Sequence, residues 1–175
     1  AMVRQIEVYG AGTLGEVIRH LNGEQKLSAT HINIEEILLQ GRELGNSDFA
    51  DVHGQPMVRR AAEIAAAGRH NLMIRGPPGT GKSMIAKRIP SILPPLSVDE
   101  ALEVSRIHSI AGTLPEEGLV CVRPFRMPHH TISASGLAGG GMIPKPGEIS
   151  LAHRGVIYLD EIPEFRKETI EVLRQ

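Results

Sequence analysis

The sequence has very few aromatic side chains. They make up 3% of its 175 residues, and tryptophan is absent. Proteins that bind single-stranded nucleic acid stack the bases on aromatic rings, and we do not expect such a platform here. Hydrophobic residues make up 41% of the chain, so aliphatic side chains must build the core. This is enough for one α/β domain and an appendage.

The sequence also lacks a second cysteine, an excess of charge and a long apolar run. Cys121 cannot form an internal disulfide, which favours a reducing cytoplasm, and we interpret it as a small buried side chain. The 19 basic and 20 acidic side chains give a net charge of −1, so contact with a polyanion must be local. No run approaches the roughly 20 apolar residues that span a bilayer, and no signal-peptide pattern is present. We expect a soluble cytoplasmic protein without membrane contact.

The first part of the chain predicts a small appendage. Residues 6–9 favour a short strand, and Thr13 with Glu16 forms a capping-box pattern that begins a helix. One strand and one helix bury too little surface to fold alone, so residues 1–28 are interpreted as the end of an upstream domain. Residues 29–50 are interpreted as a linker with a helical stretch near 34–39.

Stronger signals begin at residue 51. Pro56 suits the first turn of a helix that Gly68 can end, and residues 71–75 predict a buried strand. A second helix is expected from Lys82, although Pro90 would kink or end it.

The remaining elements follow from capping and turn residues. Ser97 and Glu100 form a capping box that opens a helix to about residue 110. The stretch 112–147 is rich in Gly and Pro and favours hairpins or a mobile loop. Further on we expect a buried strand at 156–159 and a helix at 167–174.

A phosphate-binding motif, G-x-x-x-x-G-K-S, lies between the expected strand and helix. Glycines allow backbone amides to close around phosphate oxygens, and the helix N-terminus adds a favourable dipole. Lys82 would neutralise the β- and γ-phosphates, and Ser83 would give a hydroxyl to Mg²⁺. The expected ATP contacts are Gly76, Pro77, Pro78, Gly79, Thr80, Gly81, Lys82, Ser83 and Met84.

Two carboxylates complete the expected site. Asp160 and Glu161 follow the apolar run 156–159, and ligands bind at the carboxyl ends of parallel strands. Asp160 is predicted to hold Mg²⁺ with Ser83. Glu161 is predicted to polarise the attacking water, which makes Glu161 and Lys82 the candidate catalytic residues.

The long stretch between the two motifs indicates an insertion. Arg123, Arg126, His129 and His130 lie in it and could contact a polyanion or a neighbouring subunit. For the two histidines, hydrogen bonding or capping is favoured over a metal site.

Together these motifs resemble the AAA+ ATPases of the magnesium-chelatase subunit-I-like group, and within it the YifB and ComM proteins. The resemblance covers residues 51–175. It rests on the segments DVHGQ at 51–55, HNL at 70–72, the phosphate-binding loop at 76–83, LPPLS at 93–97, RPFR at 123–126, PHH at 128–130 and PKPGEISLAH at 144–153.

The resemblance implies a three-layer αβα P-loop fold with a parallel sheet, of which this chain holds the N-terminal part. It places Val52 and His53 beside the adenine, and it makes residues 113–147 a helix-2-type insert with a hairpin facing the pore of a hexameric ring. Residues 1–28 are similar to the end of a Lon-protease-like domain. The family's sensor residues, arginine finger and lid come after Gln175, so this chain is expected to bind ATP better than it hydrolyses it.

Three functions remain at this point. The resemblance to ComM implies a DNA-remodelling motor, of the branch-migration or helicase type, used in recombination or transformation. The alternative is a magnesium chelatase subunit that drives metal insertion into a porphyrin. The third is a sensor or scaffold that binds ATP without hydrolysing it. The intact pair Asp160 and Glu161 argues against this third function.

Overall fold

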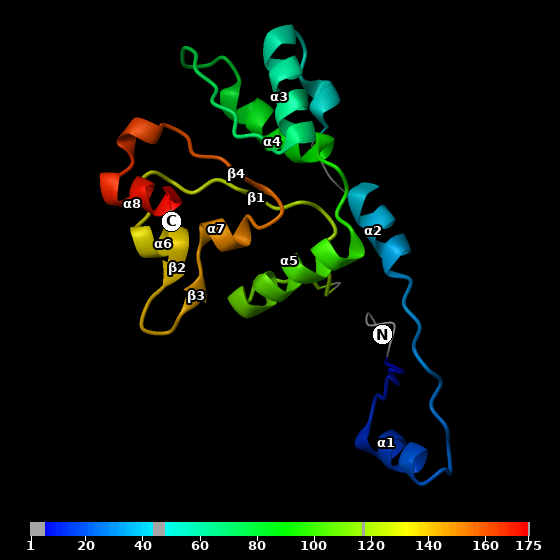
Figure 1. Cartoon of the computed structure of the whole chain (residues 1–175). Coiled ribbons are helices and arrows are strands. Elements are labelled where there is room, and N and C mark those ends of the chain that lie inside the picture. The colour runs from blue at the N-terminus through cyan, green and yellow to red at the C-terminus, as the bar shows by residue number, and fades with distance from the viewer. Residues whose placement is uncertain (1–5, 44–47, 117, 175) are drawn as a thin grey trace. The chain divides into compact units, whose positions relative to one another are not determined.

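A computed structural model describes residues 6–43, 48–116 and 118–174. The chain divides into two compact units, residues 1–37 and 38–175 (Figure 1). Residues 1–5 of the expected remnant and 44–47 of the expected linker lie outside the described residues. Helix α2, Ile34–Glu43, crosses the boundary between the units and confirms the predicted helical stretch.

The first unit contains helix α1, Leu14–Leu21. The Thr13 hydroxyl accepts a hydrogen bond from the amide of Glu16, as predicted. The Glu16 carboxylate, however, accepts a hydrogen bond from the amide of Gly12 and not from that of Thr13. The predicted strand at residues 6–9 is wrong, because only a single antiparallel bridge joins Tyr9 to Ala29. One bridge does not make the repeated ladder that defines a strand.

Helices α3, Pro56–Gly68, and α4, Lys82–Ile92, enclose the first part of the core in the second unit (Figure 1). Both helices begin where the sequence predicts, and α4 continues two residues past Pro90. The buried side chains of this cluster are Phe49, Val52, Ala62 and Ile85, with Val58, Leu72, Ile74, Ile89 and Ile92 packed around them. The loop before α4 is therefore supported by packed aliphatic side chains.

Helix α5, Val98–Ala111, has both hydrogen bonds of the predicted capping box, between Ser97 and Glu100. Gly112 ends it in the left-handed conformation, φ 72°, which glycine adopts without steric cost. The buried face of α5 carries Ala101, Val104 and Ser105.

The region expected to form hairpins or a mobile loop contains more structure than predicted. It includes strand β1, Phe125–Arg126, helix α6, Ala134–Ala138, and an antiparallel hairpin of β2, Gly139–Gly140, and β3, Lys145–Pro146. Helix α7, Glu148–Leu151, follows. At the hairpin's turn Met142 and Ile143 are exposed by 103% and 77%, so the turn presents apolar side chains to solvent.

The only parallel pairing among the described residues joins β1 to β4, Val156–Ile157, in the register Phe125 to Val156. The expected strand at 156–159 is thus shorter than predicted. The expected strand at 71–75 is wrong: the segment has no paired neighbour in the described chain, although Leu72 and Ile74 pack on the core. The architecture is mixed α/β with a small parallel sheet.

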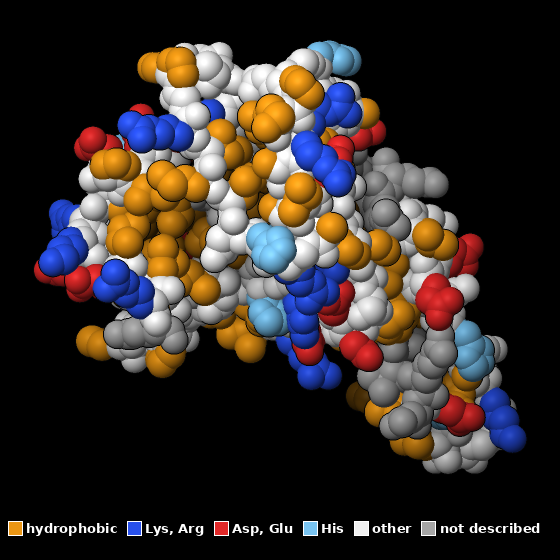
Figure 2. Space-filling model, turned by 45° about the horizontal axis from the view of Figure 1, so that its top comes forward, with side chains coloured by type: hydrophobic (Ala, Val, Ile, Leu, Met, Phe, Trp, Pro, Cys, Tyr) orange, Lys and Arg blue, Asp and Glu red, His pale blue; other side chains and the backbone are white. Residues whose placement is uncertain are grey.

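After β4, a short helix α8, Lys167–Glu171, continues as a 3₁₀ turn at Val172–Arg174, within the helix predicted at 167–174. Apolar side chains gather on the side of the second unit where α6 and α8 lie (Figure 2). No helix in the described part of the chain is long and apolar enough to cross a membrane.

Candidate nucleotide and magnesium site

The phosphate-binding loop at 76–83 joins the irregular segment 71–75 to helix α4. Gly79 and Gly81 have φ values of 76° and 80°, a left-handed conformation that favours glycine. Gly81 is the N-cap of α4 and makes no side-chain cap, so the first amides of the helix have no partner within it. An eleven-residue helix that starts here provides both the amides and the dipole that a phosphate requires.

Side chains of the loop are held by its own carbonyl groups. The Lys82 ammonium donates to the carbonyl oxygens of Gly76 at 3.0 Å and Pro77 at 2.9 Å, and the Thr80 hydroxyl donates to Pro77 at 2.9 Å. The positive charge of Lys82 therefore lies within the loop. Met84, in the first turn of α4, is exposed by 40%.

Gln55 ties the preceding segment to this loop. Its side-chain amide donates to the carbonyl oxygen of Thr80 at 3.0 Å, and its backbone is left-handed, with φ 49°. Of the two residues that the resemblance placed beside adenine, Val52 is fully buried in the core and His53 is exposed. His53 is therefore the more accessible of the two side chains. No motif in the sequence marks Gln55, and its role follows only from its contact with Thr80.

The two predicted magnesium ligands lie together although 77 positions separate them. The Ser83 hydroxyl donates to Oδ2 of Asp160 at 3.1 Å. Both side chains offer oxygen atoms as metal ligands. Mg²⁺ in nucleotide sites takes one or two protein carboxylates together with phosphates and waters. The residues present therefore fit this ion.

Tyr158 is a third member of this cluster that the sequence analysis missed. Its hydroxyl donates to Oδ1 of Asp160 at 3.1 Å and lies 3.4 Å from Oγ of Ser83. Burial raises the pKa of Tyr158, and the hydrogen bond to Asp160 raises it further, which together outweigh the lowering by Ser83. No signal local to residue 158 could have found it, because its contact with Ser83 arises from the packing of distant segments.

Glu161, the candidate base, is 67% exposed and has a left-handed backbone, φ 52°. Its backbone amide donates to Oδ1 of Asp160 at 3.1 Å, so the Asp160 carboxylate accepts a hydrogen bond from the residue that follows it. Oε2 of Glu161 lies 3.8 Å from Nδ1 of His130, an ion pair only when the histidine is protonated. The insert thus reaches the candidate base.

The adjacent histidines make different contacts. Nδ1 of His129 is hydrogen-bonded to the Thr131 hydroxyl at 2.9 Å. The ring centroids of His129 and His130 lie 4.0 Å apart. Among the described residues no group of three or more His, Cys, Asp or Glu could hold a metal ion. The favoured interpretation, hydrogen bonding, matches the His129 contact.

Comparison with known proteins decides the family. Residues 48–175 match the family described as "Magnesium chelatase, subunit ChlI". The chain belongs to this family. Over all 175 residues it is 43% identical to "Competence protein ComM" of Haemophilus influenzae, and the aligned region makes up 34% of that protein's length.

Other relatives include "Uncharacterized protein YifB" of Salmonella typhimurium, 52% identical over 129 residues, 74% of this chain and 26% of the relative. The protein of the same name in Escherichia coli is 45% identical over 168 residues, 89% of this chain and 33% of the relative. The chain therefore spans between about a quarter and a third of the length of these relatives. Members of the magnesium chelatase ChlI family are AAA+ ATPases, which use ATP and Mg²⁺.

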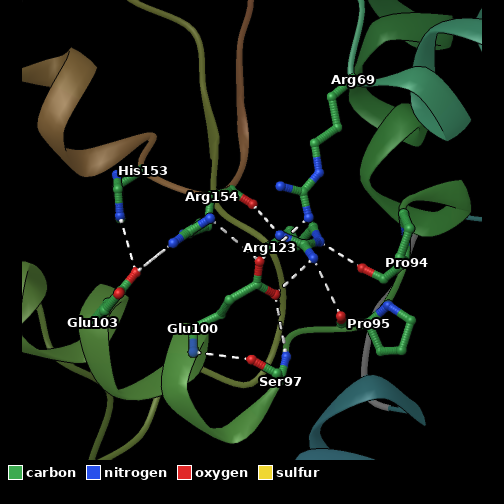
Figure 3. A network of polar contacts seen from close by, with 9 residues as sticks. All are labelled: Arg69, Pro94, Pro95, Ser97, Glu100, Glu103, Arg123, His153 and Arg154. Atoms are coloured by element: carbon green, nitrogen blue, oxygen red, sulfur yellow. Dashed lines mark hydrogen bonds and ion pairs between the residues drawn. The ribbon is translucent and has the colours of Figure 1, made fainter.

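In this ChlI-family chain, a buried arginine connects the segments that carry the site (Figure 3). Arg123 precedes β1 and donates to the carbonyl oxygens of Pro94, Pro95 and Arg154 and to the Glu100 carboxylate. Pro94 and Pro95 follow α4, and Arg154 precedes β4. The contacts of Arg123 therefore join the segment that follows α4, the helix of Ser83, to the segment that precedes β4, after which Asp160 lies.

These contacts correct the expectation that Arg123 touches a polyanion. Its side chain is only 7% exposed, and its donors are engaged inside the protein. Arg126 is held by both oxygens of Glu148, at 2.6 and 2.7 Å. Cys121, expected to be buried, is half-buried.

Proposed function

We propose that this chain is the ATP-binding part of an AAA+ ATPase of the ComM and YifB type, which couples hydrolysis of Mg-ATP to the remodelling of DNA. The observation that carries the nucleotide part is the contact of Ser83 with Asp160 at 3.1 Å beside the phosphate-binding loop. Two residues 77 positions apart meet where Mg²⁺ and phosphate would lie.

Each residue of the site has a chemical role in this proposal. The loop amides and Lys82 bind the β- and γ-phosphates, and Ser83 with Asp160 holds the metal. Ser83 and Asp160 would hold Mg²⁺ there, and the ion would supply positive charge against the charge that develops on the phosphates. Glu161 accepts a hydrogen bond from the attacking water, and its high exposure leaves it able to reach that water. His53 contacts the adenine base.

The larger assembly belongs to the proposal as well. The chain forms part of a three-layer αβα AAA+ core, and the complete protein assembles as a hexameric ring. Residues 113–147, which include the β2–β3 hairpin, engage DNA. Support for DNA as substrate comes from the name of the competence protein, whose sequence aligns with the entire chain, and from the resemblance through the insert.

Nucleotide binding can be tested on this chain. We expect a fluorescent ATP analogue to bind in the presence of Mg²⁺, and Lys82→Ala to weaken binding by at least about tenfold, because it removes the charge that neutralises the phosphates. Lys87→Ala is the matched control, since Lys87 lies on the same helix and is exposed. Equal binding by wild type and Lys82→Ala would contradict the nucleotide assignment.

The motor function needs the longer protein that contains this chain. We expect its ATPase rate to rise on addition of branched DNA, and Glu161→Gln to keep ATP binding while turnover falls by at least about a hundredfold. The proposal would be wrong if the longer protein neither bound DNA nor changed its ATPase rate with DNA.

The family description itself favours a second candidate, a magnesium chelatase subunit that drives metal insertion into a porphyrin. Identity to the competence protein along the whole chain supports the DNA motor over it. Insertion of Mg²⁺ into a porphyrin by the longer protein with chelatase partner subunits, in the absence of any DNA effect, would reverse this preference.

A further inference from the structure

The Tyr158 hydroxyl occupies a fixed position beside the candidate metal ligands. Its backbone amide donates to the carbonyl oxygen of Arg126 at 2.8 Å, which continues the pairing of β4 with β1. Its ring is stacked with that of Phe125, with centroids 6.3 Å apart and planes at 22°. Because both backbone and ring are held, the hydroxyl has little freedom to move.

The hydroxyl is directed at one oxygen of the Asp160 carboxylate. Oδ1 accepts hydrogen bonds from Tyr158 and from the amide of Glu161, both at 3.1 Å. Oδ2 accepts one from Ser83 at 3.1 Å. Two donors therefore fix Oδ1, and the carboxylate cannot rotate without breaking them, so Oδ2 stays beside Oγ of Ser83.

The phenol is a reliable donor in this place. Its hydroxyl lies 3.1 Å from Oδ1 of Asp160, and an ionised carboxylate can only accept a hydrogen bond. Outer partners of this kind orient metal ligands, and their removal commonly lowers metal affinity or activity by about 10- to 100-fold.

We propose that Tyr158 is a positioning residue of the magnesium site, whose hydroxyl orients the Asp160 carboxylate so that Oδ2 and the Ser83 hydroxyl face one cation. This inference rests on the proposed Mg-ATP function. Tyr158 acts through Asp160 and does not bind the nucleotide, so its removal changes the requirement for Mg²⁺ and leaves nucleotide affinity without metal intact.

The isosteric variant Tyr158→Phe isolates the hydroxyl, because it keeps the ring against Phe125. The affinity of the chain for a fluorescent, non-hydrolysable ATP analogue is measured in EDTA and across a titration of Mg²⁺. We expect Tyr158→Phe to raise the half-saturating Mg²⁺ concentration about tenfold and to leave affinity in EDTA unchanged. Tyr9→Phe is the matched control, since Tyr9 also donates to a carboxylate, that of Glu7, at 2.8 Å, and it should leave both values unchanged.

A second pair of variants tests whether Tyr158 acts through Asp160. In an Asp160→Asn background, adding Tyr158→Phe should cause no further change in the Mg²⁺ requirement, because the carboxylate that it orients is gone. Additive effects would overturn the proposal, and so would a loss of affinity in Tyr158→Phe that is equal with and without Mg²⁺, the result of a merely structural role.

The outcomes separate this inference from the proposed function. If wild type shows a Mg²⁺ dependence that Asp160→Asn weakens and Tyr158→Phe does not, only the positioning role fails. If wild type binds no nucleotide, or binds it as Lys82→Ala does, the proposed function fails and the positioning role falls with it.

Discussion

The guanidinium of Arg123 donates to Oε2 of Glu100 at 2.9 Å, and the two side chains are only 7% and 15% exposed. Glu100 is also the acidic member of the capping box of α5. A single carboxylate thus caps a helix and neutralises a buried arginine that joins the segments around the site (Figure 3). Stability and site geometry therefore depend on the same pair.

Replacement of Arg123 tests this dependence. Arg123→Met leaves Glu100 with only its more exposed partners, Arg69 and Arg154. Breaking a buried pair costs up to about 3–5 kcal/mol. We expect a loss of that size in the free energy of unfolding, measured with urea. Arg60→Ala is the control, since Arg60 pairs with Glu63 at the surface with 72% exposure, and such pairs contribute about 0–1 kcal/mol. Similar losses in both variants would contradict the role assigned to Arg123.

Glu100 also predicts how stability changes with pH. Burial by itself raises its pKa, but the amide of Ser97 and the charges of Arg123 and Arg154 outweigh burial and leave it below 4.5. A carboxyl whose pKa is lower in the folded state stabilises the fold above its unfolded pKa, and this stability is lost as pH falls through the folded pKa. The loss should therefore begin below about pH 4.5.

Urea unfolding at several pH values checks this prediction. Glu100→Gln should be less stable than wild type at pH 7, and the difference should shrink as pH falls below 4.5. Glu116→Gln, a change at an exposed glutamate, should follow wild type throughout. A difference between Glu100→Gln and wild type that is constant with pH would refute the assignment.

A side chain at position 81 is expected to strain the backbone. Its φ of 80° is left-handed, and this conformation costs other residues about 1–2 kcal/mol. We expect Gly81→Ala to lower stability by that amount and to weaken nucleotide binding, as measured by thermal unfolding and titration. Gly15→Ala lies inside helix α1, where an added Cβ would meet only the Thr13 hydroxyl, at 3.9 Å. It should be neutral or stabilising by up to about 1 kcal/mol.

Replacement of Gln55 should lower nucleotide affinity without lowering the stability of the fold. Gln55→Gly removes the hydrogen bond to Thr80 and relieves a left-handed backbone at φ 49°. We expect unchanged or higher stability, and nucleotide affinity about fivefold lower, the equivalent of one hydrogen bond of about 1 kcal/mol. The prediction fails if affinity is unchanged or if stability and affinity fall together.

The sequence by itself determined the features that depend on neighbouring residues. The helix starts at Pro56 and Lys82, and the capping box of Ser97 with Glu100, follow from side chains that act within one turn. The phosphate-binding loop and the pair Asp160 and Glu161 could be recognised in the same way, since their spacing carries the chemistry. The roles of these residues toward ATP and Mg²⁺ stay predictions.

Tertiary structure decided everything that depends on a distant partner. Residues 71–75 and 156–159 have similar apolar patterns, yet only the latter contains a strand, because a strand exists where another backbone pairs with it. Burial of Arg123 and the contact of Tyr158 with Asp160 and Ser83 likewise arise from the way segments pack. No pattern local to residue 158 could show that its hydroxyl would meet a serine 75 positions away.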